Sequence, residues 1–420
     1  MSDTATQQTV PGSAPGGAEA PSRWRKAFTS ITSGNAIISL FAVLAAVIVG
    51  SIMIAFTDKD VQEAAGYFFS RPGDTLVAIW DSVSGAYVAL FKGSIYNFTA
   101  DTFVKGIRPL TETLKFATPL IAAGLGVGLA FRAGMFNIGG QGQILMAAAA
   151  AGWVGTTMSM PWPLHMIVGI IAGMAAAAIW AGIAGFLKAR TGAHEVIVTI
   201  MLNHIAVYLL AWMLATQGVL QAPGSKNPKT AAMAESAIMP QILGPQFKLH
   251  LGLLLALIAV AFSWWLLERS SLGFRFRAVG LNPSAAKVAG INVGRTYFVA
   301  MVIAGALVGI AGVSQVQGTV TSGFGGDIDA GIGFDAITVA LLGRSSPLGI
   351  LAAGLLFGAF KAGGFAMQAS QGVPVEIVLV VQSLIVLFIA APPLVRAMFG
   401  LPDPERKARK QRRQKKGVSA

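Results

Sequence analysis

The sequence predicts an all-α polytopic membrane protein with about ten transmembrane helices. Hydrophobic residues make up 54% of its 420 residues and charged residues only 12%, whereas a typical soluble domain carries about 25% charged residues. Several uncharged apolar runs also exceed the ~18 residues that separate membrane spans from core helices. These observations exclude a soluble enzyme and a secreted disulfide-rich domain, and the chain contains no Cys for disulfides or thiolate metal sites.

The first predicted span covers residues 34–56, which carry no charge and follow the basic cluster Arg23, Arg25 and Lys26. The run is too long for a signal peptide and no small-x-small cleavage site follows it, so we expect an uncleaved span. The other nine predicted spans cover residues 110–131, 138–158, 164–187, 196–216, 249–267, 296–316, 334–343, 347–360 and 377–395.

The segments between and around the spans complete the predicted organisation. Residues 57–109 mix charged and aromatic side chains and are expected to form interfacial helices, whereas Pro and Gly in residues 217–248 indicate a loop. Residues 1–33 are expected to be a disordered cytoplasmic tail, residues 34–395 the transmembrane permease domain, and residues 396–420 a basic cytoplasmic tail.

The distribution of basic residues predicts the orientation of the spans. With ten spans, both termini lie on one side, and the segments on that side carry 21 of the 31 Lys and Arg residues. Basic residues concentrate in cytoplasmic loops, so we expect both termini in the cytoplasm of a cell with the protein in its inner or plasma membrane. The basic tail is expected to contact anionic membrane lipids rather than nucleic acid.

An internal repeat is predicted by self-comparison of the chain. Residues 121–125, 137–140, 185–190 and 195–198 resemble residues 303–307, 331–334, 358–363 and 376–379, in the same order. Spans two to five therefore correspond to spans seven to ten. The offset of five spans is odd, so the copies would have opposite orientations, which is a transporter signature. The alternative is chance similarity between Ala- and Gly-rich segments.

A short helix is predicted within the longest basic loop, residues 268–295. Asn282 is a good N-cap, Pro283 fits the first helical turn, and Gly290 stands where a left-handed C-terminal cap is expected. Because two turns with a small-residue face bury little area alone, such a helix is expected to dock onto something else.

These residues resemble a known family. The run from Gly280 to Ile291, and residues 134–143, 195–203 and 333–343, are similar to ABC importer permeases of the nucleoside and simple-sugar branch, which is related to branched-chain amino acid and ribose permeases. The resemblance covers about residues 110–395. It implies a ten-span permease that pairs with a second, identical or homologous permease, a cytoplasmic ABC ATPase and an extracytoplasmic substrate-binding lipoprotein. ATP and Mg are expected on the ATPase, because this chain contains no Gly-x-x-x-x-Gly-Lys-Ser/Thr run.

The resemblance implies that the basic loop couples the permease to the ATPase. Its small residues would allow close approach of the ATPase surface, and its arginines could pair with acidic residues there. The alternative is an ordinary solvated loop. The candidate coupling residues are Arg275, Arg277, Gly280, Asn282, Pro283, Ala285, Ala286 and Gly290.

Polar residues within or beside the spans are candidates for the substrate pathway. Amides offer paired donors and acceptors for hydroxyls and base edges, and intramembrane acids often serve function. Helix capping and helix–helix hydrogen bonding are the structural alternatives. We expect no interior Lys or Arg, and therefore a neutral polar solute rather than a nucleotide. The candidates are Asn137, Gln141, Gln143, Asn203 and Asp335.

The sequence therefore predicts the transport subunit of an ABC importer, most consistently for nucleosides. A simple-sugar permease is the alternative within the same class. An ion-coupled secondary transporter would need paired intramembrane carboxylates or a Na⁺ site, and it would leave the coupling loop unexplained. A passive channel or structural membrane protein is a third alternative, which a requirement of transport for ATP would exclude. The sequence contains no paired carboxylates, Ser/His/Asp set or metal cluster, so we expect no catalysis, metal or cofactor in this chain.

Overall fold

The fold is taken from a computed structural model that describes residues 35–391 and the single positions 394 and 398. Residues 45–390 form one compact unit. The predicted tails, residues 1–33 and 396–420, lie outside the described residues apart from position 398.

Every predicted span coincides with a helix. The helices concerned are α2 (Asn35–Thr57), α5 (Phe103–Arg132), α6 (Gly140–Thr157), α7 (Leu164–Thr191), α8 (Glu195–Ala215), α9 (Gly252–Arg269), α12 (Val293–Ser314), α13 (Ile332–Leu342), α14 (Pro347–Gln371) and α15 (Val375–Ala390). Several extend beyond the predicted bounds, because hydropathy detects only the apolar part of a helix. Thus α14 continues past Lys361 until Gly372 ends it in the left-handed conformation.

The remaining helices lie outside the predicted spans. Residues 57–109 contribute α3 (Lys59–Ala65) and α4 (Pro72–Ser94), which confirms that this segment is helical. Residues 217–248 form a loop with one short 3₁₀ helix, η1 (Glu235–Ala237). The basic loop contains α10 (Ser271–Leu281) and α11 (Pro283–Val288), and a π-helical turn, η2 (Gln315–Thr319), continues α12.

The chain is an all-helical polytopic membrane protein. By length and composition, six helices within the described residues can cross a membrane: α5, α7, α8, α9, α12 with η2, and α14. Shorter apolar helices accompany them, among them α13, whose 11 residues rise about 16 Å against a hydrocarbon core of about 30 Å. The membrane crossing of α2, α6, α13 and α15 and the inverted repeat remain predictions.

Helix α5 lies at the centre of the core. Every residue from Ala117 to Ala130 is buried, so this helix is covered on all sides. The starts of α6 and α13 meet beside it through two glycines. A Cβ atom on Gly333 would collide with the backbone nitrogen of Gln141, and one on Gly140 would lie 2.8 Å from the carbonyl oxygen of Gly333. Such close backbone approach through small residues is a common way to pack membrane helices.

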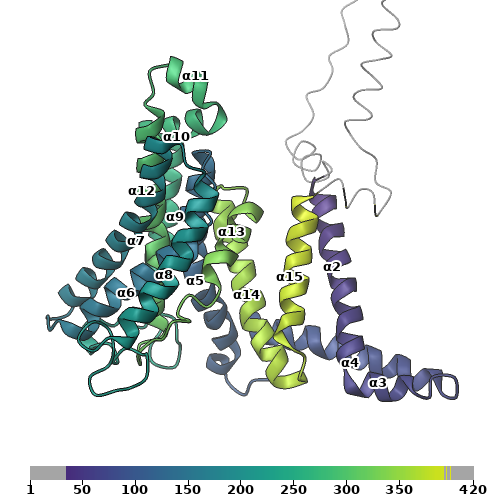
Figure 1. The fold of residues 1–420 in the computed structure, drawn as a ribbon. Helices are drawn as coiled ribbons and strands as arrows, with labels where there is room; N and C mark the ends of the chain where they lie inside the picture. Colours follow the sequence, from purple (N-terminus) through teal and green to yellow (C-terminus); the bar gives the residue numbers. More distant parts are fainter. Residues whose placement is uncertain (1–34, 392–393, 395–397, 399–420) are drawn as a thin grey trace, which may run out of the picture. The chain divides into compact units, whose positions relative to one another are not determined.

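The two ends of the helical unit differ in what they carry. Helices α10 and α11 lie at one end, whereas α3 and α4 lie at the opposite end (Figure 1). We refer to these as the α11 end and the α4 end.

Candidate functional site

The coupling segment, residues 270–291, folds as two consecutive capped helices. The Ser270 side chain accepts a hydrogen bond from the backbone N–H of Gly273 at the start of α10, and Asn282 Oδ1 accepts one from Ala285 N at 3.0 Å at the start of α11. Gly290 has a φ of +81°. The predicted short helix and its caps are thus confirmed. Helix α10 was not predicted, although Leu272, Phe276 and Val279 follow a helical period.

The candidate coupling residues divide into exposed and packed positions. Five are exposed: Arg275, Asn282, Pro283, Ala285 and Gly290. By contrast, Ala286 is only 4% exposed and faces its own chain. Gly280 lies against the end of α5, where a Cβ atom would collide with the carbonyl oxygen of Arg132, and Arg277 is partly buried.

Two apolar side chains project beside these exposed positions. Leu281 is 87% exposed at the end of α10, and Val288 is 92% exposed at the end of α11. Exposed apolar side chains that gather on one surface can mark an interaction site. Neither residue was among the coupling candidates predicted from sequence, which are small, capping or basic residues.

Three of the candidate pathway amides form a buried cluster at the start of α6. Asn137, Gln143 and Asn203 are at most 3% exposed. Asn137 Oδ1 accepts hydrogen bonds from Gly139 N at 3.0 Å and from Gln143 Nε2 at 2.9 Å. In return, Asn137 Nδ2 donates to Gln143 Oε1 at 3.3 Å.

Asn203 connects this cluster to α8. Its Nδ2 donates to the carbonyl oxygen of Ile138 at 2.9 Å, and its Oδ1 accepts from Gly142 N at 2.9 Å. These bonds satisfy backbone groups that the start of α6 would otherwise leave unpaired. The geometry favours the structural alternative for Asn137, Gln143 and Asn203, which we call the amide cluster. Gln141 is partly exposed and belongs to the turn that contacts Gly333.

Asp335 lies in a different environment, on the wall of a cavity. Its Oδ2 forms an ion pair with Lys361 Nζ at 2.8 Å, and Lys361 also donates to the carbonyl oxygen of Ala330 at 3.5 Å. Their side chains are 24% and 17% exposed. The expectation of no interior Lys or Arg was therefore wrong. Lys361 was assigned to an outer helix end because the predicted span stopped one residue before it.

The cavity beside this pair measures about 450 Å³ and lies between α5, η2, α13, α14 and α15. We call it the α13 cavity. Two buried glutamines contribute to its lining: Gln315, 7% exposed, and Gln382, 5% exposed. Gln315 Nε2 donates to Ile328 O at 3.5 Å, whereas Gln382 Oε1 has no hydrogen-bond partner among the described residues. Neither was predicted, although each is an amide within a predicted apolar span.

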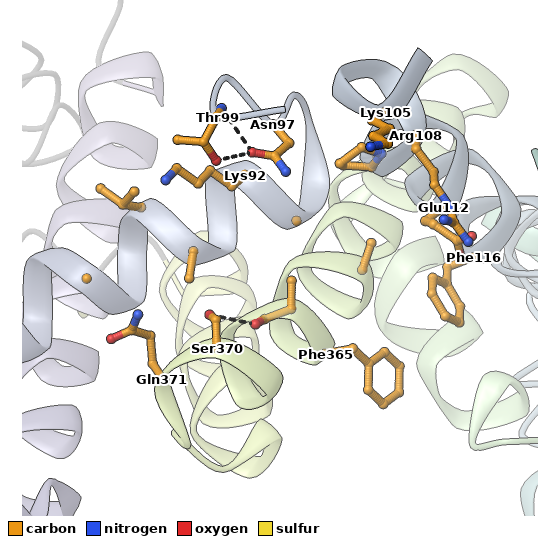
Figure 2. A pocket seen from close by; sticks show the side chains of 17 residues that line it. Lys92, Asn97, Thr99, Lys105, Arg108, Glu112, Phe116, Phe365, Ser370 and Gln371 are labelled. Atoms are coloured by element: carbon orange, nitrogen blue, oxygen red, sulfur yellow. Dashed lines mark hydrogen bonds between the residues drawn. The ribbon is translucent and has the colours of Figure 1, made fainter. Parts of the chain in front are cut away.

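A larger cavity of about 910 Å³ lies at the α4 end, between α4, the beginning of α5 and α14 (Figure 2). We call it the α4 cavity. Lys92, Lys105 and Arg108 contribute to its lining, together with Glu112, which pairs with Lys115 one turn along α5. The lining therefore includes more basic than acidic side chains.

The loop between α8 and α9 is held against η2 by a buried histidine. His250 Nε2 lies 3.2 Å from Thr319 Oγ1, and its Nδ1 accepts a hydrogen bond from Gly252 N at 3.2 Å. Burial, together with the charge of Lys115, lowers the pKa of His250 to about 4. The imidazole is therefore neutral at pH 7. Among the described residues, no group of three or more His, Asp or Glu side chains could hold a metal ion.

The chain matches known proteins over most of its length. Residues 110–390 match the family described as branched-chain amino acid transport system / permease component. A guanosine ABC transporter permease from Bacillus subtilis is 38% identical over 76% of this chain and 89% of its own length. A nucleoside ABC transporter permease from Lactococcus lactis is 34% identical over 76% of this chain and 90% of its own.

A sugar permease is similar to nearly the same degree. A glucose ABC transporter permease from Haloferax volcanii is 35% identical over 67% of this chain and 75% of its own length. No solved structure matches the chain significantly.

Proposed function

The chain belongs to the permease components of the branched-chain amino acid transport system type, and on that premise we propose that it imports nucleosides. Membership of this family makes the chain a non-catalytic transport subunit of an ABC transporter, which implies an ATPase partner. An ion-coupled secondary transporter is thereby excluded. The proposed solute is supported by the names of two relatives, guanosine and nucleoside permeases. Import of a simple sugar is the second candidate, because a glucose permease is similarly identical.

The coupling segment is the observation that carries the proposed mechanism. Ala285, Leu281 and Val288 are exposed on or beside a capped two-turn helix. We assign this surface to the cytoplasmic ATPase, which binds ATP and Mg. The exposed Arg275 can pair with acidic residues of that partner.

Motion of α11 can reach the membrane helices through two contacts of α10. Gly273 packs on the backbone of α9 at Leu266 and Leu267, and Gly280 packs on the end of α5 at Arg132. Both approaches involve backbone atoms and leave no space for a side chain. Closure of the ATPase would therefore displace α9 and α5 with the coupling segment, and α5 lines both cavities.

The charges at the α11 end support a cytoplasmic location for this end. Lys188, at the end of α7, lines the same depression as Ser284 and Lys287 of the coupling segment, and Arg132 donates to the carbonyl oxygen of Ser345 at 3.0 Å. The ends of α5 and α7 thus meet the coupling segment. Because positive charge concentrates on the cytoplasmic side, we place the α11 end and both chain termini there.

The other partners follow from the relatives and from the opposite end. Bacillus subtilis has two chains named guanosine ABC transporter permease, which are 38% and 26% identical to this chain. We therefore propose a second, homologous permease as the membrane partner. An extracytoplasmic binding lipoprotein would deliver the solute at the α4 end.

Replacement of Ala285 tests the coupling role. Ala285→Arg places a long charged side chain on the exposed face of α11 and should block docking, with at least a tenfold loss of solute-stimulated ATPase activity and uptake in proteoliposomes. Membrane insertion should be normal, because Ala285 is exposed. Ala286→Arg is an unsuitable test, because Ala286 is buried and an arginine there would unfold the coupling segment itself.

Ala232→Arg is the matched control, an exposed alanine in the loop between α8 and α9. It should retain ATPase binding in a pull-down assay. The coupling assignment fails if Ala285→Arg binds the ATPase and transports at the wild-type rate. Because the chain has no Cys, a Ser284→Cys variant also reports whether α11 is labelled from the cytoplasmic side.

A further inference from the structure

We propose that the α13 cavity is the chamber that holds the solute during passage, with Gln382 and Gln315 recognising a neutral polar ring. The inference rests on the proposed import function and assigns it a site. It replaces the amide cluster, whose side chains are bonded to one another and to the backbone, as the place where solute is bound.

Gln382 is the strongest indication of a ligand. It is 5% exposed, its side chain lines the cavity, and its Oε1 has no hydrogen-bond partner among the described residues. A buried acceptor without a donor is destabilising, and native proteins rarely retain one without a role. A hydroxyl or ring N–H of a solute would supply the missing donor.

The chamber has the dimensions and electrostatics of a site for a neutral solute. Its volume of about 450 Å³ lies within the range of small-molecule pockets, about 300–1,000 Å³. Lys361 and Asp335 neutralise each other at 2.8 Å, and Lys115 pairs with Glu112. Because the cationic groups are already paired, they offer little to a phosphate or carboxylate. The wall also includes η2, and π-helical turns are frequent at functional sites.

Two aromatic rings separate this chamber from the α4 cavity. Phe116 and Phe365 contribute to the lining of both cavities, and their ring centroids lie 5.6 Å apart. Figure 2 shows both rings at the edge of the α4 cavity. The rings therefore form a partition on the route from the α4 end, and they provide an apolar surface on which a planar base or a sugar face can stack.

Replacement of the unpaired amide tests the chamber directly. Gln382→Leu removes the acceptor with little change in size. In proteoliposomes containing the complete transporter, it should raise the KM for labelled guanosine about tenfold, with the thermal stability unchanged or higher. Gln368→Leu is the matched control, since Gln368 is exposed on α14 and lines neither cavity. An unchanged KM for Gln382→Leu would overturn the chamber assignment while leaving the import function standing.

A cysteine at the same position gives a readout that is independent of transport. In a Gln382→Cys variant, labelling by a thiol reagent should slow several-fold in the presence of guanosine, or of glucose if the chain carries sugars. Adding Phe365→Ala should accelerate labelling from the α4 side. If neither solute protects this cysteine, the chamber is not where solute binds, whatever the transporter imports. If the wild type takes up neither guanosine nor glucose, the proposed substrates are wrong instead.

Discussion

The amide cluster and the α13 cavity contain the same kind of side chain and use it differently. In the cluster, the amide groups of Asn137, Gln143 and Asn203 pair with one another and with the backbone. In the cavity, Gln382 is also buried, yet its Oε1 has no hydrogen-bond partner within the part of the chain that the structure describes. Burial of a polar group alone thus does not indicate a binding site, and the distinction lies in whether hydrogen-bonding capacity remains beside an open volume.

The largest effect is expected at the contact between Gly140 and Gly333. This contact joins the start of α6, which holds the amide cluster, to the start of α13, which lines the α13 cavity. Gly333→Val would force a side chain into the backbone of Gln141. Since backbone cannot move aside like a flexible side chain, we expect a loss of about 3 kcal/mol or more of folding stability. Gly326→Val is the control, because no atom lies within 4 Å of a Cβ there. Yields of folded protein in detergent should fall for Gly333→Val alone, and equal yields would refute the close contact.

The replacement Asn203→Leu tests the structural role of the amide cluster, and we expect an effect of intermediate size. The change removes two hydrogen bonds and leaves the N–H of Gly142 and the carbonyl of Ile138 without their partner. We expect a loss of about 2–5 kcal/mol of stability, since an unsatisfied buried group costs about 1–3 kcal/mol. Thermal unfolding should shift strongly relative to Ile197→Ala, an exposed change on the same helix. The KM of the remaining folded protein should stay constant, and a raised KM at normal stability would restore Asn203 to the pathway.

The smallest effect is expected for the ion pair of the cavity. Lys361→Met and Asp335→Asn should each destabilise the protein, and the double variant should recover part of the loss. The coupling energy should be about 1 kcal/mol, because the side chains are partly exposed. The ion pair between Lys188 and Glu195, whose charged atoms are also 2.8 Å apart, provides a reference double-mutant cycle. Strictly additive effects would show that Lys361 and Asp335 act independently.

The helices and the short capped helix were predictable from sequence because their signals are local. Apolar runs located every span helix, and Asn282, Pro283 and Gly290 defined α11 within a few residues. Helix α10 was not predicted, because arginines and glycines lie between its three periodic apolar residues. In each case the information lies within one continuous run of the chain.

The α13 cavity was not predictable in the same way, because five separate segments build it. Gln315 and Gln382 are amides within apolar runs, and the sequence does not show which face of its helix each one occupies. Asn137, Gln143 and Asn203 were recognised as polar and interior. Their mutual bonding depends on how α6 and α8 pack, so the sequence alone could not distinguish their structural role from solute binding.

The meeting of α6 and α13 at their first turns also has an electrostatic consequence. Each helix start carries about half a positive charge from its aligned peptide dipoles, and Gly140 and Gly333 bring two such starts together. Asp335 stands in the first turn of α13, where it and Lys361 compensate each other. The buried Asp329 adds a second carboxylate here, because its Oδ1 accepts a hydrogen bond from Gly333 N at 3.0 Å and offsets the positive end of α13. The chain itself thus compensates the start of α13, which leaves little positive charge to attract an anionic solute and agrees with the neutral solute proposed for the chamber.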